Sequence, residues 1–132
     1  TGPVSAVLYV ETSAPNTDFT AQLLYVEPDG RTFNITEGIV RREFRQDSGP
    51  ERISIELWPT SIGLEAGRRL RLDIASSNYP RWDANPNTGR DPARETAPVS
   101  ATQRIFWGGA TPSYITLPLI PTSPPLTEET PR

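Results

Sequence analysis

Apolar and polar residues alternate along several stretches of the chain with the period of two that β-strands show. The clearest cases are residues 52–57 and 69–74, where every second residue is Ile or Leu and the residues between are charged or Ser. One apolar and one polar face are typical of strands in antiparallel sheets. Further extended runs are predicted at 4–11, 18–26, 31–36, 39–44, 105–107 and 115–119.

Turn residues separate these runs and indicate how they connect. Pro28-Asp29-Gly30 favours a tight turn, because Pro fixes φ near −65° and Gly accepts positive φ. We interpret Gly38 as the end of one strand before the next. About eight short strands and no helix of ten or more residues predict an all-β fold, an antiparallel jelly-roll β-sandwich over residues 1–120. Residues 121–132 are rich in Pro, Thr and Glu, and we expect a disordered tail there.

Composition excludes much of the usual catalytic chemistry. The 132 residues include no Cys, His or Met, so the chain has no disulfide, no thiolate nucleophile, no Ser-His-Asp triad and no zinc site of the usual Cys or His type. Carboxylates are scattered and show no calcium-loop spacing. We therefore expect no catalytic residue, no metal site and no cofactor in this chain.

Charge and hydropathy narrow the range of partners. All 13 basic residues are Arg, and 16 acidic residues give a net charge of −3, which argues against nucleic-acid binding. The chain contains no run of eighteen apolar residues, so the sequence predicts no membrane span. The first residues show no leader and no initiator Met, so we expect a piece of a longer polypeptide. The sequence does not fix the compartment, and a cytoplasmic location is favoured over secretion.

Residues 77–98 break the strand pattern and contain no aliphatic residue larger than Ala. A loop of this length inside a compact domain is uncommon and is often functional. Its aromatic, amide and charged side chains could form turns by bonding nearby backbone, dock onto another domain, or bind a sugar. The candidate residues are Asn78, Tyr79, Arg81, Trp82, Asp83, Asn85 and Asn87.

Three residues outside this loop are also candidates for special roles. Asp18 precedes Phe19 at the start of a predicted strand, where it could bond loop backbone as a buried group or lie at an interface. Trp58 and Trp107 end or interrupt apolar alternations. We expect them to fill the sandwich core or to line a contact with another domain.

Several blocks of the sequence resemble, in the right order, the C-terminal domain of the X-prolyl dipeptidyl-peptidase and cocaine-esterase (CocE/NonD) hydrolases. The resemblance covers about residues 4–120. Arg68 and Thr111 stand where the family usually has His, and Asn16 replaces the common Asp. The blocks are residues 13–21 (S-x-A-P-D-T-D-F in the family), 26–30 (V-x-P-D-G), 36–41 (T-x-G-x-x-R), 57–61, 67–81 (G-H-R-L-R-L-x-I-x-S-S-x-F-P-R), 85–89 (N-x-N-T-G) and 112–118 (H-P-S-x-x-x-L-P).

This resemblance implies a galactose-binding-like jelly roll at the C-terminal end of a longer serine hydrolase. It implies that the nucleophilic Ser, the Asp and the His belong to an α/β-hydrolase domain upstream of Thr1, and the chain's own lack of His and of G-x-S-x-G agrees. The partner would then be that catalytic domain, with homo-oligomerisation as a further possibility. Arg81, Trp82 and Asp83 are the residues we expect at the contact surface.

Two other functions stay open at this point. The first is a free-standing carbohydrate-binding module of the same jelly-roll fold, for which the loop at 77–89 would supply the aromatic and amide side chains. The second is a structural or capsid-like jelly roll, which nothing beyond the fold class supports. The substrate of a parent enzyme cannot be read from this chain, because peptidases and ester hydrolases share this kind of domain.

Overall fold

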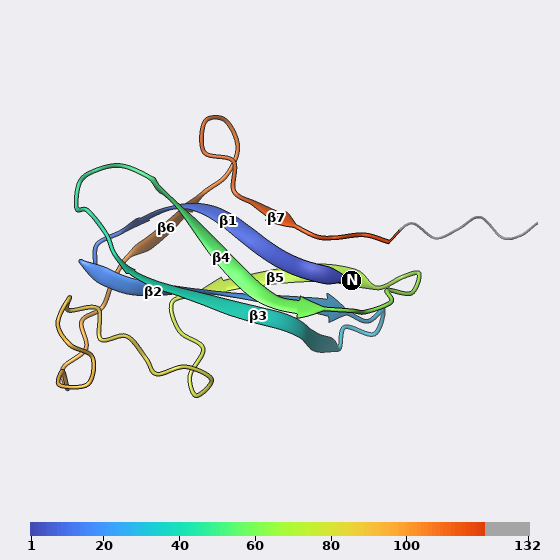
Figure 1. The fold of residues 1–132 in the computed structure, drawn as a ribbon, viewed down its shortest axis with the longest axis horizontal. Helices are drawn as coiled ribbons and strands as arrows, with labels where there is room; N and C mark the ends of the chain where they lie inside the picture. Colours follow the sequence, from blue (N-terminus) through green and yellow to red (C-terminus); the bar gives the residue numbers. More distant parts are fainter. Residues whose placement is uncertain (121–132) are drawn as a thin grey trace, which may run out of the picture.

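Two antiparallel sheets form the part of the chain that the computed structural model describes, residues 1–120 (Figure 1). In the first sheet, β1 (Gly2–Thr12) pairs with β4 (Glu51–Thr60) along one edge and with β6 (Gln103–Phe106) and β7 (Tyr114–Thr116) along the other. In the second, β2 (Asn16–Val26) lies between β3 (Thr32–Glu43) and β5 (Arg69–Ala75). The predicted all-β sandwich is confirmed, while the jelly-roll and galactose-binding-like topology stays a prediction.

The alternating apolar positions meet between the two sheets. Every second residue of β1 points inward, and Ala6 pairs with Ile55 of β4 on that inner face. Phe19 of β2 closes the core from the second sheet and packs edge-on against Phe44 at 5.8 Å between ring centroids. The period of two in the sequence therefore marks the buried face of each strand. The buried apolar residues are Val4, Ala6, Leu8, Val10, Phe19, Ala21, Leu23, Phe44, Ile53, Ile55 and Leu57.

The interpretation of Gly38 as a break between strands is wrong. Residues 32–43 form one continuous strand, β3, so the described residues contain seven strands where about eight were predicted. Gly38 lies inside β3 where β4 passes close by, and a Cβ at this position would overlap the carbonyl of Glu56. Close approach of another backbone is a known reason for glycine inside a strand. Beside it, the Thr36 hydroxyl donates a hydrogen bond of 2.6 Å to the Trp58 carbonyl.

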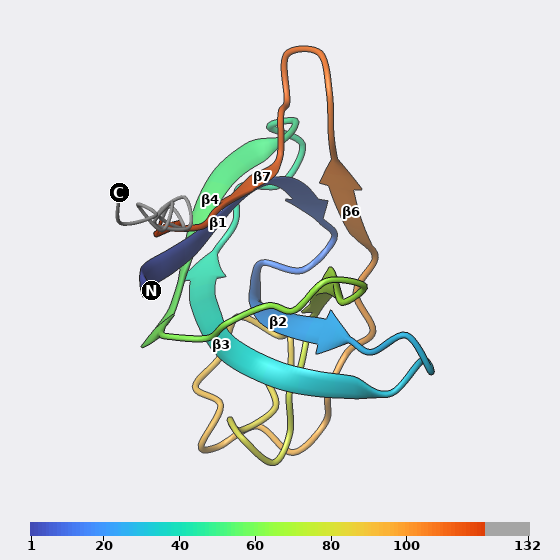
Figure 2. The same cartoon turned by 90° about the vertical axis from the view of Figure 1, so that its right-hand side faces the viewer.

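The sandwich is closed on one side and less so on the other. β3 and β4 lie against each other and join the two sheets at one edge. On the opposite side, the inward residues of β5, β6 and β7 are only partly buried, for example Leu72, Ile74, Ile105 and Ile115. In Figure 2, the arrowhead end of β3 lies beside β4 on the left, and β6 lies on the right.

Several smaller expectations need correction. Trp58 is 65% exposed and Trp107 is 80% exposed, so neither fills the core, whereas a contact with another domain stays a prediction. The run predicted at 115–119 ends early, because β7 stops at Thr116 and Leu119 is 84% exposed. The tail predicted at 121–132 lies outside the described residues. Within residues 1–120 no helix is long and apolar enough to cross a membrane.

Candidate functional site

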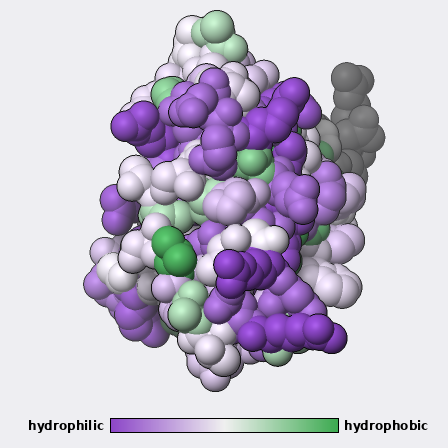
Figure 3. Space-filling model, turned by 90° about the vertical axis from the view of Figure 1, so that its left-hand side faces the viewer, coloured by the Kyte–Doolittle hydropathy of each residue, from purple (hydrophilic) through white to green (hydrophobic). Residues whose placement is uncertain are grey.

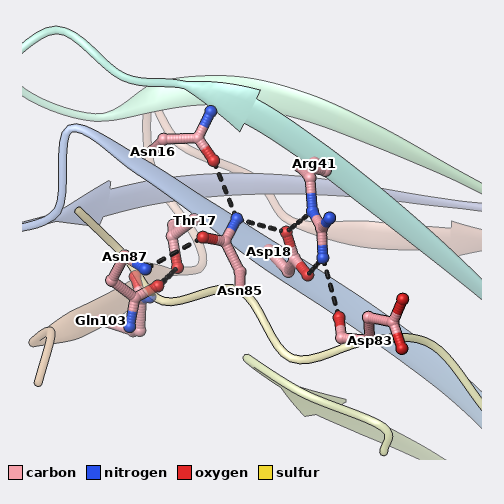
Figure 4. A network of polar contacts seen from close by, with 8 residues as sticks. All are labelled: Asn16, Thr17, Asp18, Arg41, Asp83, Asn85, Asn87 and Gln103. Atoms are coloured by element: carbon pink, nitrogen blue, oxygen red, sulfur yellow. Dashed lines mark hydrogen bonds and ion pairs between the residues drawn. The ribbon is translucent and has the colours of Figure 1, made fainter. Parts of the chain in front are cut away.

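The long segment between β5 and β6 lies against the end of the second sheet where β2 begins and β3 ends (Figure 1). Asn85 reaches Asn16 of β2, and Asn87 reaches Thr17. These contacts join residues about seventy positions apart in the sequence. Figure 4 shows the polar network that results, and we call its eight residues the loop-anchoring network: Asn16, Thr17, Asp18, Arg41, Asp83, Asn85, Asn87 and Gln103.

A buried ion pair between β2 and β3 forms the centre of the network. Asp18 is 1% exposed and sits opposite Arg41 in the strand pairing. Arg41 Nε donates to Asp18 Oδ1 at 2.7 Å and Nη2 donates to Oδ2 at 2.8 Å, so the guanidinium binds both carboxylate oxygens. These hydrogen bonds to Asp18 raise the pKa of Arg41 above its ordinary value. Arg41 therefore stays charged, and the buried carboxylate keeps its partner.

The loop adds its own groups to this pair. Arg41 Nη2 also donates to the Asp83 carbonyl at 2.8 Å, which ties the loop backbone to β3. Asn85 Nδ2 is shared between Asp18 Oδ1 and Asn16 Oδ1, each at 2.8 Å. The pair formed by β2 and β3 thus positions two points of the loop, the backbone carbonyl of Asp83 and the side-chain amide of Asn85.

Asn87 holds the next turn of the loop. Its φ of 63° lies in the left-handed region, which Asn adopts more readily than most residues. Its Oδ1 accepts a 2.7 Å hydrogen bond from the buried Thr17 hydroxyl, which in turn accepts one from Gln103 Nε2 at 3.0 Å. Its backbone N–H donates to Asn85 Oδ1 at 2.9 Å. The side chain and backbone of Asn87 are both engaged within the chain.

Glu37 of β3 anchors the first part of the loop separately. Its Oε2 accepts hydrogen bonds from Asn78 Nδ2 at 2.8 Å and from Gln22 Nε2 at 3.2 Å. Its Oε1 pairs with Arg81 Nε at 3.0 Å. The loop is therefore fixed at residues 78–81 and again at residues 83–87. The peptide bond between Tyr79 and Pro80, in the first of these stretches, is cis.

The candidate residues divide into two groups in the structure. In the first group, the polar side-chain groups form hydrogen bonds within the chain; its members are Asp18, Asn78, Asn85 and Asn87. The others lie on the outside of the loop: Tyr79 is 72% exposed, the Arg81 side chain is 54% exposed, Asp83 is exposed, and Trp82 is half-buried. The guanidinium of Arg81 lies over the Trp82 ring at 5.5 Å from its centroid.

This end of the molecule presents a predominantly hydrophilic surface (Figure 3). Among residues 1–120, no three His, Cys, Asp or Glu side chains gather as metal ligands would. A cleft of about 620 Å³ lies beside this end of the molecule, is lined in part by Glu11, Glu51 and Arg104, and contains none of the candidate residues. Two of its three carboxylates pair with arginines, Glu51 with Arg42 at 2.8 Å and Glu11 with Arg104 at 3.4 Å.

Sequence reasoning missed half of the loop-anchoring network and one further anchor. Arg41 was visible as one of two adjacent arginines in a predicted strand and as the Arg of the T-x-G-x-x-R block, neither of which indicated its partner. Thr17 offered a weak signal, as a polar residue beside Asp18 at the start of an apolar strand. Asn16 and Glu37 lie in the family blocks, but nothing local indicated that these two residues or Gln103 bond to distant parts of the chain. The missed residues are Asn16, Thr17, Glu37, Arg41 and Gln103.

Comparison with known proteins gives three matches. The sequence model of the family described as "X-Pro dipeptidyl-peptidase C-terminal non-catalytic domain" matches residues 1–116. A cocaine esterase from Rhodococcus sp. (strain MB1 Bresler) is 40% identical over 131 residues, covering 91% of this chain. The chain spans only 23% of the length of that relative. A crystal structure of a CocE/NonD family hydrolase from Staphylococcus aureus superposes with a TM-score of 0.61 at 18% identity, over 86% of this chain and 27% of that chain, a likeness of fold alone.

Proposed function

The chain belongs to the family of X-Pro dipeptidyl-peptidase C-terminal non-catalytic domains, as found at the end of CocE/NonD hydrolases, and we propose from this that it packs on the α/β-hydrolase domain of the same polypeptide and shapes access to its active site. The parent would be a serine hydrolase with dipeptidyl-peptidase or esterase activity. Its reaction would be acyl transfer through an acyl-Ser intermediate, with the nucleophile and its base upstream of Thr1.

The observation that carries this proposal is the way the loop at 77–98 is held. Two anchor points, Glu37 and the Asp18–Arg41 pair, hold the loop by bonds that include the Asn78 amide and the Asp83 carbonyl. Tyr79 and Arg81 are thereby held on the outside of a fixed loop. Exposed aromatic and Arg side chains on a rigid support are typical of protein contact surfaces.

The same geometry argues against a sugar site at this loop. A polyol needs amide and carboxylate groups that are available for directional hydrogen bonds. Asn85, Asn87 and Asp18 already use those groups within the chain. Tyr79, Arg81, Trp82 and the exposed Asp83 would remain for a ligand. The carbohydrate-binding module is therefore the less favoured function.

The first test concerns the reading frame that encodes the residues before Thr1. We expect several hundred upstream codons that include G-x-S-x-G followed by an Asp and a His of the triad. We expect the purified 132-residue chain to hydrolyse no ester or X-Pro peptide above the buffer rate. A start codon immediately before Thr1, or turnover by the pure chain that a serine reagent blocks, would contradict the proposal.

The second test addresses access to the active site in the intact polypeptide. We expect Tyr79→Ala and Arg81→Ala to raise KM by about 3- to 10-fold, with a smaller change in kcat, because they change the entrance and leave the reacting groups in place. Tyr114→Ala is the matched control, since Tyr114 is 49% exposed on β7 of the other sheet. Unchanged KM in both loop variants would remove the role in substrate access.

A further inference from the structure

The end of the sandwich opposite the loop opens toward the hydrophobic core. Figure 2 looks onto this end, where the N-terminus lies. A groove of about 70 Å³ has the core residues Val4 and Leu23 at its base, 1% and 4% exposed. Its rim carries Ile62, Leu64 and Leu70, which are 41%, 45% and 44% exposed. We call this feature, defined by these five residues together with Thr1, the apolar end groove.

The groove is apolar and narrow. None of the side chains that line it is charged, and the charge at its edge is the amino group of Thr1. That group donates to the Pro118 carbonyl at 3.3 Å, while the Thr1 hydroxyl lies 2.8 Å from the Ser61 hydroxyl. About 70 Å³ is small beside the roughly 300–1,000 Å³ of small-molecule sites. The groove therefore suits an aliphatic side chain of a polypeptide better than a metabolite.

We propose that the apolar end groove binds the stretch of the parent polypeptide that directly precedes Thr1, as an extended segment with aliphatic side chains. This rests on the proposed function, because it requires a longer polypeptide. Thr1 lines the groove, so a residue joined to it starts at the groove without a linker. β1 begins at Gly2, so the chain is already extended at this point.

The Thr1 nitrogen is compatible with this occupant. In a longer polypeptide the ammonium becomes a neutral peptide N–H, which can still donate to the Pro118 carbonyl. The charge at the edge of the groove then disappears while its hydrogen bond remains. An aliphatic side chain placed over Leu64 and Leu70 would remove exposed apolar surface from water, which is the main favourable term in such contacts.

A photo-crosslinking experiment in the intact polypeptide tests the proposal. A benzophenone amino acid replaces Leu64, an exposed loop residue, and mass spectrometry identifies the peptide to which it couples on irradiation. We expect coupling to the stretch of about ten residues before Thr1, which extends at most about 35 Å from it. The control places the probe at Trp107, which is 80% exposed in the turn between β6 and β7, and should not couple to that stretch.

A second measurement uses hydrophobic-dye fluorescence and thermal unfolding of the intact polypeptide. We expect Leu64→Ser and Leu70→Ser to raise dye fluorescence severalfold and to lower Tm by about 2–4 °C each, with no such change for Trp107→Ser. Each variant changes an exposed side chain, so the fold itself should survive.

Three outcomes would overturn the proposal: coupling of the Leu64 probe to a distant segment, coupling to a second copy of the chain, or coupling only within residues 1–132, of which Leu119 also lines the groove. Failure of the proposed function looks different. An upstream frame without a hydrolase domain would end that function, yet the crosslink to the residues before Thr1 could still form. A hydrolase domain upstream without that crosslink would leave the function intact and remove this inference alone.

Discussion

At the scale of single residues, the loop-bearing end depends on one buried carboxylate. The Asp18 side chain is 2% exposed and accepts three hydrogen bonds, two from Arg41 and one from Asn85. A buried charge without partners would cost several kcal/mol, so these donors are what allow Asp18 to lie inside. The pair sits between β2 and β3, and it positions the loop because the same groups also bond to loop atoms.

Removal of Arg41 should therefore destabilise the fold more than removal of an exposed arginine. We expect Arg41→Ala to lower the free energy of unfolding by about 2–4 kcal/mol, below the usual range for fully buried pairs because the Arg41 side chain is 36% exposed. Arg31→Ala is the control. It breaks a surface pair of 2.7 Å whose side chains are 68% and 55% exposed, so it should leave the free energy of unfolding nearly unchanged. Urea unfolding measures both, and equal losses would contradict the role of the buried pair.

Asn87 allows the loop anchoring to be tested by local exchange. In Asn87→Ala, an alanine must adopt a φ of 63°, which Asn adopts more readily, and the buried Thr17 hydroxyl loses its acceptor. We therefore expect the free energy of unfolding to fall by about 2–3 kcal/mol. Asn87→Gly removes the same side chain but tolerates the backbone angle and should lose less. Hydrogen exchange of residues 83–99 should speed up in both variants. A smaller loss of folding free energy in Asn87→Ala than in Asn87→Gly would show that the backbone angle is not under strain.

The partner of Asp18 could not be found from the sequence because of one extra residue. The turn at Pro28-Asp29-Gly30 correctly predicts the hairpin of β2 and β3, and regular pairing around it would place Val40 opposite Asp18. A bulge at Ile35 shifts the register by one position, so that Arg41 takes this place. No residue type near Ile35 signals the bulge. The sequence therefore predicted the hairpin and marked Asp18 as a candidate residue, but it did not predict the ion pair, and Asp18 bonds to side chains where loop backbone was one of the expected partners.

At the scale of elements, the period of two predicted most strands to within a few residues. It worked best for β4 and β5, where inward and outward faces differ sharply in polarity. It failed at Gly38, because glycine was taken for a turn residue while its role is to let β4 approach β3. That contact involves residues 18 positions apart on different sheets, and a local pattern contains no information about it.

Gly38 gives the sharpest test of this close approach. Because a Cβ would overlap backbone atoms of Glu56 and Leu57, neither of which can move like a side chain, we expect Gly38→Ala to cost about 3 kcal/mol or more, or to abolish folding. Gly63→Ala is the matched control, since no atom lies within 4 Å of its Cβ position, and its effect should stay within about 1 kcal/mol. Circular dichroism during thermal unfolding distinguishes the two. A Gly38→Ala variant as stable as Gly63→Ala would mean that β3 and β4 are farther apart.

At the scale of the whole molecule, the two ends differ in character. The end at Asn16, Glu43 and Ala75 is covered by the loop and bears polar residues, whereas the end at Thr1 opens into an apolar groove. The sequence indicated the loop, because 22 residues without a large aliphatic side chain stand out locally. It did not indicate the groove, since Val4, Leu23, Leu64 and Leu70 come from four separate segments that only the tertiary fold brings together.

Uneven closure of the sandwich predicts uneven local stability, which hydrogen exchange measures. In the 132-residue chain we expect the slowest amides in the middle of β1 and β2, whose inward residues are fully buried and which pair on both edges. β5 has no fully buried residue and pairs on one edge with β2, so its amides should exchange faster. In the intact polypeptide, β5 and residues 61–66 should gain protection if the groove is covered, while Gly108 and Gly109 at the β6–β7 turn should not.

Equal exchange of β5 and β2 in the short chain would mean that the open side is as stable as the closed one. Unchanged exchange at residues 61–66 in the long polypeptide would mean that nothing covers the groove.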